Sequence, residues 1–126
     1  MPFSTLNPTL QANLSALGYT DPTPIQTKVI PLMLRGRDIL GAAQTGTGKT
    51  AAFALPILQQ LGKGDADEIA RPRALILVPT RELATQMTRA IRSYALGLDL
   101  RILNVFGGVN IDKQIASLSK GADLLI

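Results

Sequence analysis

The sequence contains no cysteine and no histidine. The first absence excludes disulfides, and the two together exclude Cys/His zinc sites and acid–base catalysis by imidazole. Charged residues are also scarce, at 17% of the 126 residues, whereas hydrophobic residues make up 46%. This balance excludes a disordered, highly charged tail and is typical of one folded domain with a buried core.

Long apolar runs are missing as well. The longest, Ala51–Leu58, is far too short to span a bilayer, and Met1–Leu10 lacks the basic residue and apolar stretch of a secretory signal. We therefore expect a cytoplasmic protein with no membrane partner. The sequence leaves the oligomeric state open, and nothing in it indicates an obligate dimer.

The charge that is present is positive on balance. Thirteen Lys and Arg against nine Asp and Glu give a formal net charge of +4 and a pI near 9.9. This excess suits a polyanionic partner such as a nucleic acid, although many ordinary domains carry a similar one. The basic residues are spread along the chain rather than gathered in a run.

Two helix starts are visible near the N-terminus. In Asn7-Pro8 and in Thr23-Pro24, a capping residue precedes a proline at the first helical position. Gly18 should end the first helix and Gly36 the second, in which Pro31 should cause a kink or an interruption.

Further along the chain, short apolar strands alternate with helices, which predicts an α/β fold with a parallel sheet flanked by helices. The aliphatic run 74–78 indicates a strand buried on both faces, and the polar stretch Gly62–Pro72 an exposed loop. Because the last strand has barely begun at Ile126, we expect the chain to be a fragment. The predicted strands are Asp38–Ala42, Ala74–Val78, Leu100–Phe106 and Asp123–Ile126, and the helices between them are Lys49–Leu61, Arg81–Leu96 and one from Asn110 to about Lys120.

The strongest chemical signal is the stretch Ala43–Thr50, which follows a predicted strand and opens a helix. Gly46 and Gly48 permit the tight turn in which successive backbone N–H groups converge on a phosphate, and the positive end of the helix points at the same place. Lys49 supplies an ammonium for the β- and γ-phosphates, and Thr50 a hydroxyl for Mg²⁺.

An ordinary Gly/Thr turn would explain the glycines of this loop, but not Gly-Lys-Thr between a strand and a helix. The first residue, Ala43, departs from the glycine of the strict pattern. The loop by itself does not identify the base, because kinases, GTPases, transporters and helicases share it.

The stretch Gly18–Gln26 lies upstream of the loop. A helix end, a proline turn and a new helix start explain most of it, with Thr23 as a cap and Ile25 as a core residue. Gln26 could also pair with an adenine edge, because a carboxamide both donates and accepts, and Tyr19 could stack on the base.

Four elements together carry a family resemblance. Gly18–Gln26 resembles the Q motif of DEAD-box RNA helicases, and Phe3 is similar to the isolated aromatic upstream of that motif. Ala43–Thr50 resembles motif I, in which alanine is the usual first residue. Pro79–Ala84 resembles motif Ia, and Gly107-Gly108 the GG element. Since these elements occur in the family's order over nearly the whole chain, it is identified as a member, with motif wording that indicates a bacterial one.

The resemblance implies a RecA-like P-loop NTPase fold, with residues 1–126 as the N-terminal part of the first helicase domain. It implies that Gln26 reads the adenine of ATP, that Tyr19 packs on the ring and that Thr23 connects this motif to the phosphate loop. The residues that would hold the triphosphate and Mg²⁺ are Thr45, Gly46, Thr47, Gly48, Lys49 and Thr50, of which Lys49 and Thr50 are the catalytic candidates. The residues that would line the RNA backbone path, without reading its sequence, are Pro79, Thr80, Arg81, Gly107 and Gly108.

From the residues alone, a strand stop followed by a helix start, with Arg81 and Glu82 solvated, is the favoured explanation of Pro79–Ala84, and a plain turn is the favoured explanation of Gly107-Gly108. The family's Asp-Glu-Ala-Asp and Ser-Ala-Thr elements are absent from the sequence. Hydrolysis needs groups that position Mg²⁺ and the attacking water. We therefore expect the whole protein to be an RNA-dependent ATPase that separates short duplexes, and this piece to bind nucleotide weakly without turnover.

Two other functions are compatible with parts of the sequence. A P-loop kinase or GTPase would share Ala43–Thr50 but gives no reason for Gly18–Gln26. A non-catalytic RNA-binding module would account for the positive charge but leaves Lys49 without a role.

Overall fold

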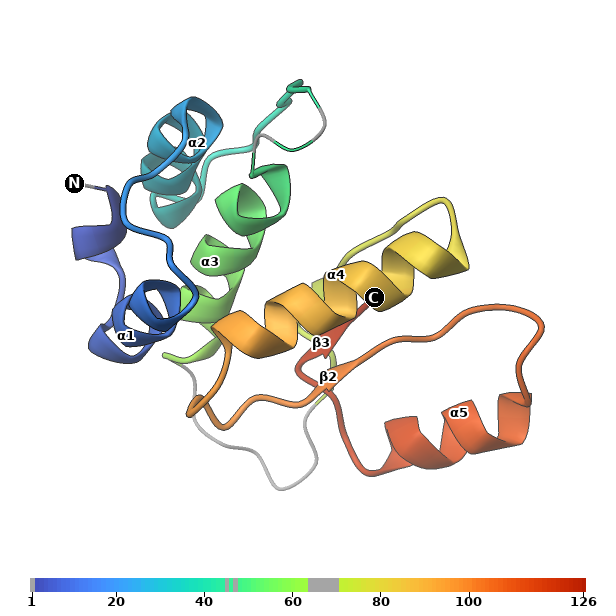
Figure 1. The fold of residues 1–126 in the computed structure, drawn as a ribbon. Helices are drawn as coiled ribbons and strands as arrows, with labels where there is room; N and C mark the ends of the chain where they lie inside the picture. Colours follow the sequence, from blue (N-terminus) through green and yellow to red (C-terminus); the bar gives the residue numbers. More distant parts are fainter. Residues whose placement is uncertain (1, 45, 47, 64–70) are drawn as a thin grey trace.

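The computed structural model describes residues 2–44, 46, 48–63 and 71–126. None of the helices in these ranges is long and apolar enough to cross a membrane. In chain order, the elements are the 3₁₀ helix η1 (Pro2–Thr5), α1 (Pro8–Ala16), α2 (Pro24–Leu34), α3 (Lys49–Leu61), β1 (Ala74–Leu75), α4 (Arg81–Tyr94), β2 (Ile102–Leu103), α5 (Ile111–Ser119) and β3 (Leu124–Leu125) (Figure 1).

The helix caps predicted from the sequence are present. The Asn7 side chain accepts a hydrogen bond from the Leu10 amide at 2.9 Å, and Thr23 caps α2. α3 has the predicted bounds, and α4 ends two residues before the predicted end. α2 continues through Pro31 as one helix, so the interruption, one of the two effects predicted for Pro31, does not occur. η1 was not expected from the sequence.

The sheet is parallel, as predicted, with the order β1-β3-β2. Ala74 and Ile102 lie on either side of Leu124, and α4 and α5 form the two crossovers. The strands are shorter than predicted, but single backbone bonds extend the pairing. The Ile76 amide donates to the Leu125 carbonyl at 2.9 Å, and the Val105 amide donates to that of Ile126 at 2.8 Å.

The strand predicted over 38–42 is wrong. These residues all belong to the described part of the chain, and they are not hydrogen-bonded to β1, β2 or β3. Leu40 is fully exposed, and the segment runs from the end of α2 to the loop before α3 without joining the sheet (Figure 1). An apolar run becomes a strand only when a neighbour takes its backbone N–H and C=O groups, and the strands described here pair with one another.

Burial of 74–78 on both faces is also wrong. Side chains alternate along an extended segment. Ala74, Ile76 and Val78 pack against the core, whereas Leu75 is 62% exposed and Leu77 is 83% exposed. In the described ranges helices cover one face of this segment, and α5, which buries no residue, stands apart from it (Figure 1).

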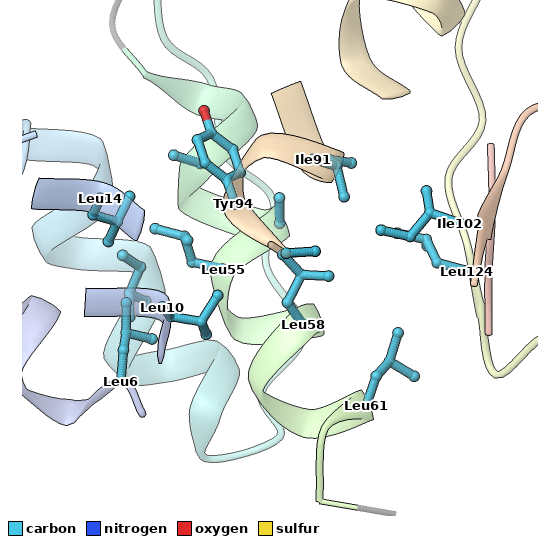
Figure 2. Packing of buried hydrophobic residues seen from close by; sticks show 14 of the residues in the cluster. Leu6, Leu10, Leu14, Leu55, Leu58, Leu61, Ile91, Tyr94, Ile102 and Leu124 are labelled. Atoms are coloured by element: carbon cyan, nitrogen blue, oxygen red, sulfur yellow. The ribbon is translucent and has the colours of Figure 1, made fainter. Parts of the chain in front are cut away.

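The core lies between α3 and its neighbours. α1 and α2 lie on one side of α3, and α4 contacts α3 as well as β2 (Figure 1). Figure 2 shows Leu14 of α1, Leu55 and Leu58 of α3, and Ile91 of α4 directed into one cluster that reaches Leu124 of β3. α3 is therefore held along its length, which fixes the position of its first turn, where the phosphate loop was predicted.

The buried carboxylate of Asp123 holds the start of β3. Its Oδ2 accepts from the Arg101 amide at 2.7 Å. The side chains of Arg73 and Arg101 approach it at 3.5 and 3.6 Å, so its charge is compensated at the beginning of the central strand.

Candidate functional site

The predicted phosphate loop leads directly into α3. Gly46 and Gly48 have φ angles of +80° and +81°, in the left-handed region that glycine adopts without strain. Gly48 is the N-cap residue, and no described side chain caps the helix. The first amides of α3 and the positive end of its dipole therefore suit an anion. Thr45 and Thr47, also predicted for this loop, lie outside the described residues.

Lys49 is the first residue of α3, and its side chain is exposed. Its Nζ donates a hydrogen bond of 2.7 Å to the carbonyl oxygen of Ala43, across the base of the loop. An ammonium has three N–H donors, so this bond does not exhaust it. Thr50 follows in the same turn and is half-buried.

Gln26 connects α2 to this loop. Its side chain is completely buried, with Oε1 accepting from the Thr23 amide at 3.0 Å and Nε2 donating to the Gly48 carbonyl at 3.2 Å. A methyl group on Gly48 would overlap that amide nitrogen and lie 3.3 Å from Thr23 Cγ2. The loop can therefore approach α2 this closely only with glycine at position 48. Thr23 was predicted to help make this connection; the direct hydrogen bond to the loop comes from Gln26, whose Oε1 the Thr23 amide holds.

The carboxamide of Gln26 keeps some capacity after these two bonds. An amide has two N–H donors and two oxygen lone pairs, and each of its ends has one bond here. One donor and one acceptor remain, which is the pattern that pairs with an adenine edge.

One cavity is lined by residues of both Gly18–Gln26 and Ala43–Thr50. Its volume of about 820 Å³ is within the usual range of small-ligand sites. It lies where α2 and the first turn of α3 face α4. Among its lining residues are the predicted nucleotide residues Tyr19, Thr23, Gln26, Gly46, Gly48, Lys49 and Thr50, and, from α4, Leu83, Gln86, Met87, Ala90 and Tyr94.

The contribution of α4 to this cavity was not predicted. Leu83, Met87, Ala90 and Tyr94 recur at helical spacing, which is also the pattern of an ordinary core face. No signal in the sequence distinguishes the two. Tyr19, predicted to pack on the base, meets Tyr94 of this set, with their hydroxyl oxygens 3.1 Å apart.

The residues predicted to contact RNA lie at the carboxyl ends of two strands. Pro79 and Thr80 follow β1, and the Thr80 hydroxyl caps α4 by accepting from the Leu83 amide at 3.2 Å. The carboxyl ends of parallel strands share one edge of the sheet, where ligands commonly bind. All five of these predicted residues are exposed.

The structure brings Arg81 and Gly108 into direct contact. Gly108 has a φ of +77°, and a methyl group on it would lie 2.5 Å from Nη2 and 2.8 Å from Cζ of Arg81. The guanidinium therefore packs on the bare Cα of Gly108. A methyl group added to Gly107, by contrast, would have no atom within 4 Å. The sequence did not predict this contact.

Gln114 of α5 supports the segment that leads to the two glycines. Its Oε1 accepts from the Phe106 amide at 3.0 Å and its Nε2 donates to the Phe106 carbonyl at 3.2 Å. Both backbone groups of Phe106 are therefore held immediately before Gly107, by a side chain that the sequence did not single out.

Comparison with known proteins identifies the family. A family sequence model described as DEAD/DEAH box helicase matches residues 23–126. The chain is 48% identical over 114 residues to the RNA helicase CrhR of Synechocystis sp.. The aligned region covers 90% of this chain and 22% of that protein. It is 44% identical over 121 residues to the ATP-dependent RNA helicase dbp10 of Schizosaccharomyces pombe, covering 96% of this chain and 14% of that protein.

Solved structures agree. The RNA helicase Prp28 from Chaetomium thermophilum bound to ADP matches with a TM-score of 0.86 and 39% identity, over 97% of this chain and 30% of that one. A DEAD box protein from Methanococcus jannaschii matches with a TM-score of 0.85 and 37% identity, over 96% and 32% of the two chains. These likenesses confirm the predicted RecA-like α/β fold. The chain, which spans about a fifth or less of the length of the two sequence relatives, belongs to the DEAD/DEAH box helicase family.

Proposed function

We propose that this chain is the ATP-binding part of an ATP-dependent RNA helicase, with residues 1–126 forming the N-terminal part of its first RecA-like domain. The observation that carries this proposal is the hydrogen bond from Gln26 to the Gly48 carbonyl, on the wall of one cavity. It supports the proposal because it connects the side chain proposed to read adenine with the proposed phosphate loop. The relatives, which include ATP-dependent RNA helicases, support the same conclusion.

The residues present fit a nucleoside triphosphate. Gly48 lets the loop lie against Gln26, since a Cβ there would overlap the Gln26 side chain. α3 offers uncapped amides, and Lys49 brings a positive charge to the loop. Anions favour such a helix start. Gln26 would select adenine, and Tyr19 would pack against the base.

The fit to Mg²⁺ is narrower. In the described ranges, no group of three or more Asp, Glu, His or Cys side chains could hold a metal ion. Thr50 would therefore contribute its hydroxyl, with the phosphates supplying further oxygens. When bound, the ion would neutralise phosphate charge.

RNA is the proposed second ligand. Arg81 packed on Gly108, with exposed turn residues around it, suits contacts to phosphates that do not read the sequence of bases. In the whole protein these contacts would hold one strand of a short duplex during unwinding. We place this activity in the cytoplasm.

The test is competition for a fluorescent ADP analogue bound to this chain in the presence of Mg²⁺. We expect ATP and ADP to displace the analogue at concentrations at which GTP and CTP do not. Equal displacement by all nucleotides would leave a generic phosphate loop and favour a kinase or GTPase. Absence of binding, in a chain that circular dichroism shows to be folded, would contradict the proposal.

Turnover is tested separately, because the sequence contains no Asp-Glu-Ala-Asp element. We expect this chain to bind ATP without sustained hydrolysis. Phosphate release above that of a Lys49→Ala control would contradict this expectation.

A further inference from the structure

Two tyrosines from distant parts of the chain meet at one end of the cavity. Tyr19 lies in the segment after α1, and Tyr94 is the last residue of α4, 75 positions later. Their hydroxyl oxygens are 3.1 Å apart, and their rings are nearly perpendicular, at 85°, with centroids 5.9 Å apart. Edge-to-face geometry at this distance is a favourable aromatic contact.

Tyr94 is the rigid member of the pair. Its residue is only 4% exposed, and its ring lies beside Leu55 with the hydroxyl directed out of the apolar cluster (Figure 2). The Asn13 side chain donates 2.7 Å hydrogen bonds to the carbonyls of Tyr94 and Leu96, which fixes the end of α4. Burial, and then the hydrogen bond with Tyr19, raise the pKa of Tyr94 above its ordinary value of 10.0, so the phenol stays neutral.

Tyr19 is the adaptable member. It is half-buried and lines the cavity together with Gln26. Its backbone amide donates to the Leu14 carbonyl at 2.9 Å, which fixes the main chain but not the rotation of the ring. The hydroxyl contact with Tyr94 is what restrains the far end of the Tyr19 ring.

We propose that Tyr94 is a positioning residue for the base: through its hydroxyl and the perpendicular ring contact it fixes the orientation of Tyr19, so that a purine meets a ring that is already in place. The inference rests on the proposed function, because it takes Tyr19 as the aromatic that packs on the base. A preoriented ring increases affinity because less conformational freedom is lost on binding. The effect belongs to the base and not to the phosphates, which α3 and Lys49 would hold.

The chain offers a direct probe of this pair. It contains two tyrosines and no tryptophan, so its intrinsic fluorescence comes from Tyr19 and Tyr94 alone. In Tyr94→Phe the only emitter is Tyr19, and in Tyr19→Phe it is Tyr94. ADP should quench emission in the first variant, because the base packs on Tyr19, and leave it almost unchanged in the second.

Affinities for ADP and for pyrophosphate should be measured by calorimetry on the full chain. We expect Tyr94→Phe and Tyr19→Phe each to weaken ADP binding about threefold to tenfold, the value of one hydrogen bond, and the double variant to be no weaker than either. Pyrophosphate binding should be unchanged. Ser93→Ala is the matched control: it removes a hydroxyl from the same turn of α4, where Ser93 Oγ donates to the Ala90 carbonyl at 2.6 Å.

The outcomes separate this inference from the proposed function. Unchanged ADP affinity in both phenylalanine variants, with adenine-selective binding by the unmodified chain, would overturn the role of Tyr94 alone. Loss of pyrophosphate affinity in parallel with ADP would also overturn it, because the effect would then be one of folding. If the unmodified chain does not bind ADP although it is folded, both the inference and the proposed function fail.

Discussion

The side chain of Gln26 joins two motifs that are 22 positions apart, because its Nε2 donates to the Gly48 carbonyl at 3.2 Å while its Oε1 accepts from the Thr23 amide at 3.0 Å. One buried carboxamide therefore completes the capping box of α2 and holds the residue that begins α3. The base and phosphate halves of the candidate site are coupled through this side chain.

Replacing Gln26 should disturb both halves. Gln26→Glu keeps an acceptor for Thr23 but opposes a carboxylate to the Gly48 carbonyl, so ADP affinity should fall about tenfold or more. Gln26→Ala should weaken ATP more than GTP in calorimetric titrations. Gln60→Glu is the control, since Gln60 Nε2 donates to the Met33 carbonyl at 3.0 Å at an exposed position. Equal losses of ATP and GTP in Gln26→Ala would contradict the adenine assignment.

Gly48→Ala should abolish nucleotide binding. Alanine at position 48 would have to adopt an unfavourable positive φ, and its Cβ would overlap Gln26 Nε2. The loop would therefore be forced away from α2. Gly36→Ala separates the two effects, because Gly36 has a φ of +75° with nothing within 4 Å. The control should lose roughly 1–2 kcal/mol of unfolding free energy and keep its ADP affinity. Urea denaturation and ADP titration of both variants measure this difference.

Gly108→Ala should weaken RNA binding although it removes no RNA-contacting group. Its Cβ would occupy the place of the Arg81 guanidinium. We expect the loss to match that of Arg81→Ala for all RNA sequences, with the salt-dependence slope reduced by about 1. Fluorescence anisotropy of a labelled oligonucleotide at several salt concentrations measures it. Additive losses in the double variant would show that the two residues act separately.

Lys49→Ala should remove the charge that we propose for binding the γ-phosphate. In a longer protein that hydrolyses ATP, the RNA-stimulated rate should fall by at least about 10²–10³-fold, as for other charge-stabilising donors. Lys63→Ala, which changes an exposed lysine beyond the other end of α3, should not alter the rate. The rate is measured as phosphate release. If Lys49→Ala lowers this rate no more than Lys63→Ala does, the proposed role of the loop in phosphate binding is contradicted.

Stability at alkaline pH should report on Tyr94. Because its pKa is raised above 10.0 in the folded chain, the unfolded chain releases this proton at lower pH. The free energy of unfolding should therefore be independent of this group below about pH 10 and fall as the pH rises toward the folded pKa. Urea denaturation between about pH 9 and pH 11 should show a steeper decline for the unmodified chain than for Tyr94→Phe. Equal slopes would contradict the shift.

The local features of the candidate site could be predicted from the sequence. The bounds of α3, the Asn7 and Thr23 caps and the positive φ of Gly46 and Gly48 depend on hydrogen bonds and steric limits within a few residues. The same local rules suggested a strand over 38–42, which has no neighbour to pair with in the described chain.

By itself, then, the sequence determined the alternation of helices with parallel strands, the glycine loop that opens α3 and the family resemblance. Only the tertiary structure decided which residues meet: Gln26 with Gly48, Arg81 with Gly108 and Tyr19 with Tyr94. These contacts join residues 22 to 75 positions apart, and they depend on how α2, α3, α4 and the ends of the strands pack. Residue spacing along one helix or strand carries no information about the element packed against it, so the coupled site emerged only from the packing.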